Sequence, residues 1–118
     1  MKIKEMASLL DAEVLCGGDM LDKEVKSACG CDMMSDVLAF VKEQAVLITG
    51  LCNPQVVRTA QMMDMVCIVF VRGKRPPAEV VALAEEEGIV LLATTERMYV
   101  ACGKLYESGL SGGSIVNG

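Results

Sequence analysis

The sequence has no histidine, no tryptophan, and only two tyrosines and two phenylalanines. Without histidine, the Ser-His and Cys-His pairs that activate nucleophiles in many hydrolases cannot form within one chain. So few aromatic side chains provide no stacking platform for single-stranded nucleic acid. A net charge of −5 also opposes binding to a phosphate backbone. These absences exclude a large class of catalytic sites and argue against a nucleic-acid partner.

Phosphate-binding and metal-binding motifs are missing as well. The chain contains neither GxxxxGK(S/T) nor GxGxxG, the glycine-rich loops of P-loop NTPases and of dinucleotide-binding enzymes. It has six cysteines but no CxxC pair, and without histidine a structural zinc site is not expected. We therefore predict a protein that is not an enzyme and that carries no metal or cofactor.

The cysteines are most simply explained as free thiols. No apolar signal segment follows Met1, and no apolar run approaches the roughly 20 residues of a membrane span, so a cytoplasmic location is the default expectation. Cys67 and Cys102 lie in patterns typical of core residues. Cys29 and Cys31 form the one close pair. Redox sensing through this pair is an open alternative, although a disulfide across a single residue would be strained.

What is present is enough for one folded domain. Of 118 residues, 53% are hydrophobic and 23% are charged, which is typical of a globular chain with a single core. We expect one domain over residues 3–110, followed by a flexible Gly- and Ser-rich tail over residues 111–118.

Short apolar runs alternate with segments of helical periodicity. This pattern predicts a three-layer α/β/α fold with a mostly parallel sheet of four to five strands. The expected strands are residues 13–16, 25–31, 45–49, 66–71 and 89–93. The expected helices are residues 3–10, a helix capped by Asp32 or Ser35 and ending near Glu43, residues 54–64 capped by Asn53, residues 78–87, and a helix capped by Thr94 or Thr95 and ending near Tyr106.

The most informative stretch is the buried strand 66–71 with the basic turn Arg72-Gly-Lys-Arg75 directly behind it. Open α/β sheets bind ligands outside the carboxyl ends of their strands, so this turn places positive charge at the expected binding edge. Arg72 is the strongest candidate, because it follows the strand immediately and can bind an anion with two N–H groups. Thr49 and Asp36 are the next candidates, with Asp36 assigned to a ribose hydroxyl.

Four loops are expected to meet at this edge of the sheet. The predicted ligand-binding residues are Asp32, Ser35, Asp36, Thr49, Gly50, Asn53, Arg72, Gly73, Lys74, Arg75, Thr94 and Thr95. For Asp32, Ser35, Asn53, Thr94 and Thr95 the alternative is helix capping alone. For Lys74 and Arg75 the alternative is a solvated surface charge, and for Gly73 it is a role in the turn alone.

The order of short motifs along the whole chain resembles the DRTGG-domain family, as a small stand-alone member. The resemblance rests on Asp22-Lys-Glu-Val25, Asp32-Met-Met-Ser-Asp36, Val46-Leu-Ile-Thr49, Arg72-Gly-Lys-Arg-Pro76, Ala84-Glu-Glu-Glu-Gly-Ile89 and the helix after Thr94-Thr95. This family is similar to the N-terminal domain of HPr kinase/phosphorylase and also occurs fused to CBS-domain regions and phosphotransacetylases. The resemblance implies an α/β/α fold and a regulatory or ligand-sensing role.

Two functions follow from these observations. The first is a regulatory domain that binds a small anionic metabolite, such as a nucleotide, and acts through a partner protein. The second is a protein–protein interaction module, such as a homodimer, that has no small-molecule ligand. It is suggested by nine methionines and the high apolar content, because surplus apolar surface is often covered by a partner or a second copy.

Overall fold

The computed structural model describes residues 1–40 and 44–110, and its centre is a five-stranded sheet with the order β1-β5-β4-β3-β2. Strands β2 to β5 pair in parallel, and β1 pairs with β5 in antiparallel orientation. The prediction of a mostly parallel sheet of four to five strands is therefore confirmed. The strands are β1 (Glu13–Cys16), β2 (Ser27–Gly30), β3 (Ala45–Thr49), β4 (Cys67–Phe70) and β5 (Val90–Ala93).

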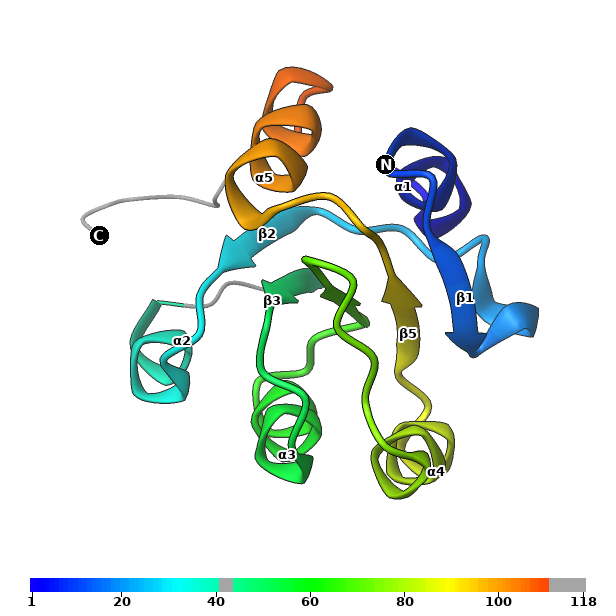
Figure 1. The fold of residues 1–118 in the computed structure, drawn as a ribbon, viewed down its shortest axis with the longest axis vertical. Coiled ribbons are helices and arrows are strands. Elements are labelled where there is room, and N and C mark those ends of the chain that lie inside the picture. The colour runs from blue at the N-terminus through cyan, green and yellow to red at the C-terminus, as the bar shows by residue number, and fades with distance from the viewer. Residues whose placement is uncertain (41–43, 111–118) are drawn as a thin grey trace.

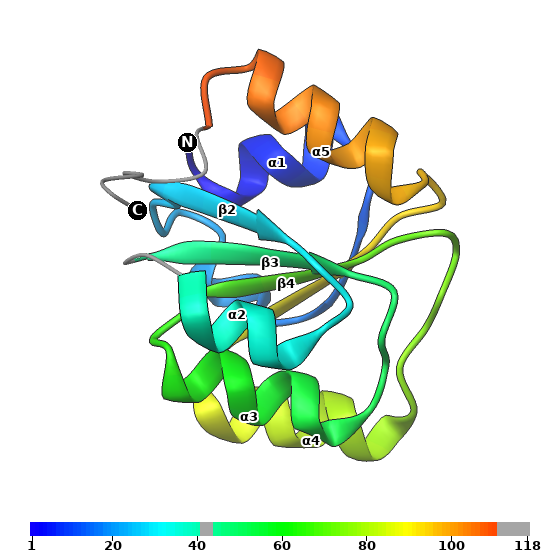
Figure 2. The ribbon, with the colours of Figure 1, turned by 90° about the vertical axis from the view of Figure 1, so that its left-hand side faces the viewer.

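Helices cover both faces of this sheet, which gives the predicted three layers (Figure 1). Helices α2, α3 and α4 connect the parallel strands and lie together on one face, whereas α1 and α5 cover the other (Figure 2). The helices are α1 (Ile3–Leu9), α2 (Met34–Phe40), α3 (Pro54–Met62), α4 (Ala78–Glu87), α5 (Met98–Glu107) and the short 3-10 helix η1 (Gly18–Met20).

The three central strands are apolar on both sides because each face of the sheet packs on helices. In β4, Val69 belongs to the core beneath α1 and α5, while Ile68 and Phe70 belong to the core beneath α2, α3 and α4. This alternation follows from the two-residue period of a strand. All residues of β3, β4 and β5 are buried, so the polar groups that follow these strands are fixed by a rigid support.

Several predicted helix starts are wrong. Helix α2 begins at Met34, so Ser35 lies inside it, and the carboxylate of Asp32 is bonded to other residues. Helix α5 begins at Met98 and is preceded by Arg97, so neither Thr94 nor Thr95 caps it. The Asn53 cap is confirmed, since its Oδ1 accepts a hydrogen bond from Val56 N at 3.3 Å.

Two expectations lie outside the described residues: the end of α2 near Glu43 and the tail at 111–118. Within the described ranges, no helix has the length and apolar character required to cross a membrane.

Candidate functional site

The ends of all five strands bring polar residues to one edge of the sheet. The parallel strands β2, β3, β4 and β5 all finish there, and β1, being antiparallel to β5, starts there. The turns after Cys31, Thr49, Val71 and Ala93 therefore share one edge, as the sequence predicts. We call this edge the rim. Its order in space runs from Asp32 past Gly50 and Arg72 to Thr94 and then to Glu13.

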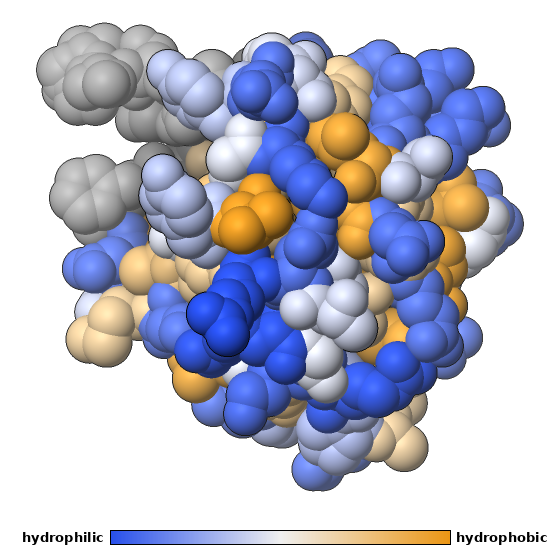
Figure 3. Space-filling model, turned by 45° about the horizontal axis from the view of Figure 1, so that its top comes forward, coloured by the Kyte–Doolittle hydropathy of each residue, from blue (hydrophilic) through white to orange (hydrophobic). Residues whose placement is uncertain are grey.

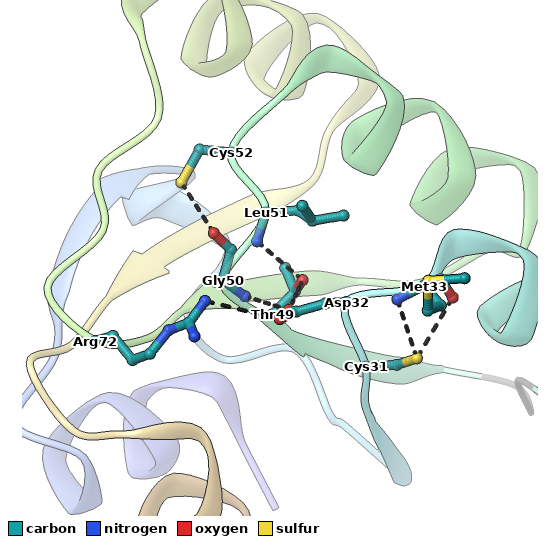
Figure 4. A network of polar contacts seen from close by, with 8 residues as sticks. All are labelled: Cys31, Asp32, Met33, Thr49, Gly50, Leu51, Cys52 and Arg72. Atoms are coloured by element: carbon teal, nitrogen blue, oxygen red, sulfur yellow. Dashed lines mark hydrogen bonds and ion pairs between the residues drawn. The ribbon is translucent and has the colours of Figure 1, made fainter.

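Asp32 is the centre of a polar cluster on one half of the rim (Figure 4). Its Oδ1 accepts hydrogen bonds from Thr49 Oγ1 at 2.9 Å and from Gly50 N at 2.7 Å. Its Oδ2 lies 3.7 Å from Arg72 Nη2. The hydrogen bond from Gly50, assisted by that from Thr49 and by the charge of Arg72, lowers the pKa of Asp32, whereas its partial burial acts in the opposite direction. Asp32 is thus an ionised anchor that ties the ends of three strands together.

Arg72 stands in a tight turn that closes directly after β4. Lys74 N donates to Val71 O at 3.1 Å, and the two central residues both have positive φ, 62° for Arg72 and 71° for Gly73. This is the φ pattern of a type I′ turn. Glycine adopts positive φ without steric cost, whereas arginine is strained there because of its Cβ. The strain is held in place because Arg72 N donates to Glu96 O at 2.7 Å and Gly73 N donates to Thr94 O at 3.0 Å.

The side chain of Arg72 lies across Gly50. A Cβ added to Gly50 would come within 2.0 Å of Arg72 Nη2, so the absence of a side chain at position 50 is what lets the guanidinium approach. The Arg72 side chain is nevertheless 47% exposed, and its contact with Asp32 is long for a hydrogen bond. A guanidinium has five N–H donors, so Arg72 can still bind an anion from solvent.

Lys74 and Cys52 lie close to this cluster. Burial raises the pKa of the Cys52 thiol, while the positive charges of Lys74 and Arg72 both act to lower it. In the part of the chain that the structure describes, Lys74 is exposed and makes no ion pair. Arg72 and Lys74 therefore form the cationic part of the rim.

The other half of the rim is a separate hollow of about 330 Å³. It contains four of the predicted site residues, Gly73, Arg75, Thr94 and Thr95, together with Asp11 and Glu13, which the sequence reasoning missed. Arg75 donates from Nη1 and Nη2 to the two carboxylate oxygens of Glu13, at 2.9 and 3.0 Å. Glu13 and Arg75 are 62 residues apart, and no local signal in the sequence connects them.

The remaining predicted residues lie at the margins of these two groups. Asn53 is occupied in capping α3, and Ser35 and Asp36 are exposed in the first turn of α2. Within residues 1–40 and 44–110, no hydrogen bond or ion pair joins Ser35 or Asp36 to Arg72, and no group of three or more potential ligand side chains is arranged to hold a metal ion. All six cysteines are free thiols.

Residues 5–108, which include all five strands of the sheet, match the DRTGG domain. The chain belongs to the DRTGG domain family. No curated protein sequence matched the chain.

Among solved structures, the DRTGG chain is similar to the CBS and DRTGG domains of the regulatory region of a Clostridium perfringens pyrophosphatase. That structure is a complex with the activator diadenosine tetraphosphate. The two chains are 16% identical and superpose with a TM-score of 0.71 over 94% of this chain and 48% of the other. The present chain thus spans about half of that regulatory region, and at this identity the likeness establishes the fold.

Proposed function

We propose that this DRTGG domain is a regulatory module that binds a small anionic metabolite, such as a nucleotide, at the rim and acts through a partner protein. The observation that carries the proposal is the position of Arg72. A half-exposed guanidinium is held over Gly50 by a strained turn, at the edge where open α/β sheets bind ligands. Strained backbone of this kind persists where the surroundings enforce it and is concentrated at binding sites.

Charge at the rim favours an anion at Arg72 and Lys74 rather than at Arg75. Two N–H groups of Arg75 bond to the two oxygens of Glu13, which offsets its charge at close range, whereas Arg72 has one long contact with Asp32. A phosphate bound here would contact the guanidinium of Arg72 and the ammonium group of Lys74. Both groups form charge-assisted hydrogen bonds with phosphate oxygens. The choice of a nucleotide is supported by the similar pyrophosphatase regulatory region, which also contains a DRTGG domain and was solved with a nucleotide activator.

A thermal-shift and calorimetry panel of ATP, GTP, CTP and inorganic tripolyphosphate tests the proposal. A ligand that binds the native state raises apparent stability by RT ln(1 + [L]/Kd). We expect at least one of these anions to bind wild type, Arg72→Lys to retain part of the affinity, and Arg72→Gln to lose about tenfold or more.

Arg58→Gln, on the exposed face of α3, is the matched control and should bind like wild type. Absence of any shift across the panel, or equal binding by Arg72→Gln and Arg58→Gln, would refute the proposal.

A second candidate function, protein–protein assembly, is favoured by the surface of α5. Tyr99 and Tyr106 are 88% and 74% exposed beside a mostly apolar groove between α5 and β2. Apolar residues on the face that carries α1 and α5 form several small patches separated by polar residues (Figure 3). Sedimentation measurements over a concentration series test this function, and a strict monomer at high concentration would count against self-association.

A further inference from the structure

The hollow between Arg75 and Glu13 differs in chemistry from the neighbouring Arg72 cluster. Its wall contains two carboxylates, Asp11 and Glu13, against one guanidinium, and that guanidinium is already paired through both nitrogens with Glu13. A second anion would therefore meet net negative charge and would have to displace Glu13. The hollow is poorly suited to a phosphate group.

Hydrogen-bond acceptors are in excess in this hollow. An ionised carboxylate offers about four lone-pair sites, and Arg75 uses one on each oxygen of Glu13. The carboxylate of Asp11 and the exposed hydroxyl of Thr95 add further acceptors. Groups that donate hydrogen bonds without carrying negative charge match this lining, and neighbouring hydroxyls on a sugar are of that kind. A volume of about 330 Å³ lies within the range of small-molecule sites.

The hollow and the cationic part of the rim are joined by one turn. Gly73 lines the hollow, and its two chain neighbours are Arg72 and Lys74. A nucleotide carries its phosphates and its vicinal hydroxyls on the same ribose, so it requires an anion subsite and a hydroxyl subsite side by side. The rim supplies that pair of subsites on the two sides of the turn.

Resting on the proposed function, we propose that the hollow lined by Asp11, Glu13 and Thr95 binds the ribose hydroxyls of a nucleotide whose phosphates contact Arg72 and Lys74. The ligand class is then a ribonucleotide rather than a simple phosphorylated metabolite. This assignment replaces Asp36 as the expected partner of the ribose. Asp36 lies on α2, which follows the edge strand β2, whereas the hollow lies at β5 and the opposite edge strand β1.

Calorimetry with ATP, GTP and CTP, their 2′,3′-dideoxy counterparts and tripolyphosphate tests this inference. For wild type we expect at least one ribonucleotide to bind about tenfold tighter than its dideoxy counterpart, the size of one hydrogen bond to a charged group. In Glu13→Gln the preference should fall to about threefold or less, while tripolyphosphate should bind at least as tightly as to wild type, because the variant removes one negative charge beside Arg75. Glu79→Gln, an exposed change on α4, should keep the full preference.

Asp11→Asn is an independent second variant. Asp11 has a φ of 51°, a conformation that asparagine tolerates, and its replacement leaves the pair of Glu13 and Arg75 intact. If Glu13→Gln loses its native circular dichroism, the test rests on Asp11→Asn. The ratio of ribonucleotide to dideoxynucleotide affinity should then fall in Asp11→Asn.

Equal binding of ribo- and dideoxynucleotides by wild type would overturn the inference. So would a wild-type preference for ribonucleotides in both Glu13→Gln and Asp11→Asn, when both are folded. If the anions bind in an Arg72-dependent way without any preference for hydroxyls, the hydroxyl subsite is wrong and the proposed function stands. If none of the anions binds, both fall together.

Discussion

The guanidinium of Arg72 occupies the space where a side chain on Gly50 would stand, with Nη2 only 2.0 Å from the position of an added Cβ. Gly50 follows β3 and Arg72 follows β4, so the contact joins two adjacent strand ends. The same Gly50 donates its N–H to Asp32, which follows β2. One glycine therefore serves both the carboxylate anchor and the placement of the cation above it.

Gly50→Ala is expected to move the guanidinium while preserving the fold. The clashing atom is the far end of a flexible side chain, so Arg72 can rotate away at little cost in stability. We expect the anion affinity measured by calorimetry to fall about tenfold, with an unfolding free energy within about 1 kcal/mol of wild type. Gly18→Ala, where no atom lies within 4 Å of the added Cβ, is the control. Unchanged affinity in Gly50→Ala would show that this position of Arg72 is irrelevant to binding.

Asp32 should make stability dependent on pH in the acid range. Its pKa is lowered in the folded state, chiefly by the hydrogen bond from Gly50 N. A carboxyl group of this kind stabilises the fold above its unfolded pKa of about 4, and that contribution is lost as the pH falls through the folded pKa. The difference in unfolding free energy between wild type and Asp32→Asn should therefore be constant above about pH 6 and shrink below about pH 4.

Asp32→Ala separates the hydrogen bonds from the charge. Asparagine keeps an oxygen that can accept from Thr49 and Gly50, whereas alanine leaves both donors without their partner. We expect Asp32→Ala to cost about 1–2 kcal/mol in urea denaturation at pH 7, and Asp32→Asn to cost less. Equal losses in the two variants, with no dependence on pH, would contradict this account of the anchor.

The sequence was sufficient for the fold and for the common rim, because both depend on local patterns. Continuous apolar runs such as 66–71 indicate strands covered on both faces, and their parallel arrangement brings the following turns to one edge. The Asn53 cap next to Pro54 was equally readable, since capping involves residues three apart.

What could not be predicted depends on contacts between distant segments. Thr94 has the residue type of a helix cap, but its hydroxyl bonds to Leu10, 84 positions away. Arg75 is an exposed charge, as its sequence pattern indicates, but the sequence does not show that its Nη1 and Nη2 pair with Glu13. Neither partner is marked by spacing or composition, so the division of the rim into a cationic part and an acceptor-rich hollow could be recognised only in the structure.

Arg72 and Gly73 form a matched pair for measuring backbone strain. Both have positive φ, but only Arg72 carries a side chain. We expect Arg72→Gly to stabilise the domain by up to about 1 kcal/mol while lowering anion affinity about tenfold or more, as in Arg72→Gln. Gly73→Ala should destabilise the domain by about 1 kcal/mol, because the added Cβ meets no neighbouring atom but its backbone conformation is unfavourable. Urea denaturation checks both values. A destabilised Arg72→Gly would mean that contacts of the arginine outweigh its strain.

Among the hydroxyl groups of the rim, that of Thr94 is expected to contribute most to the unfolding free energy. It is buried, its Oγ1 donates to Leu10 O at 2.8 Å, and the same oxygen accepts from Glu96 N at 3.2 Å. Thr94→Val should lower the unfolding free energy by about 1–3 kcal/mol because it leaves the buried carbonyl of Leu10 and the partly buried N–H of Glu96 without this partner. Thr94→Ser keeps the hydroxyl and should lose about 1 kcal/mol, the value of one buried methyl group.

Thr95→Val, at the adjacent exposed position, is the matched control and should change the unfolding free energy by less than about 0.5 kcal/mol. The order of stability in urea is then expected to be wild type and Thr95→Val first, Thr94→Ser next and Thr94→Val last. Because Leu10 directly precedes Asp11, loosening this hydrogen bond should also weaken the preference for ribonucleotides over dideoxynucleotides. If Thr94→Val is as stable as Thr95→Val, the hydroxyl does not hold the segment before β1 against the end of β5.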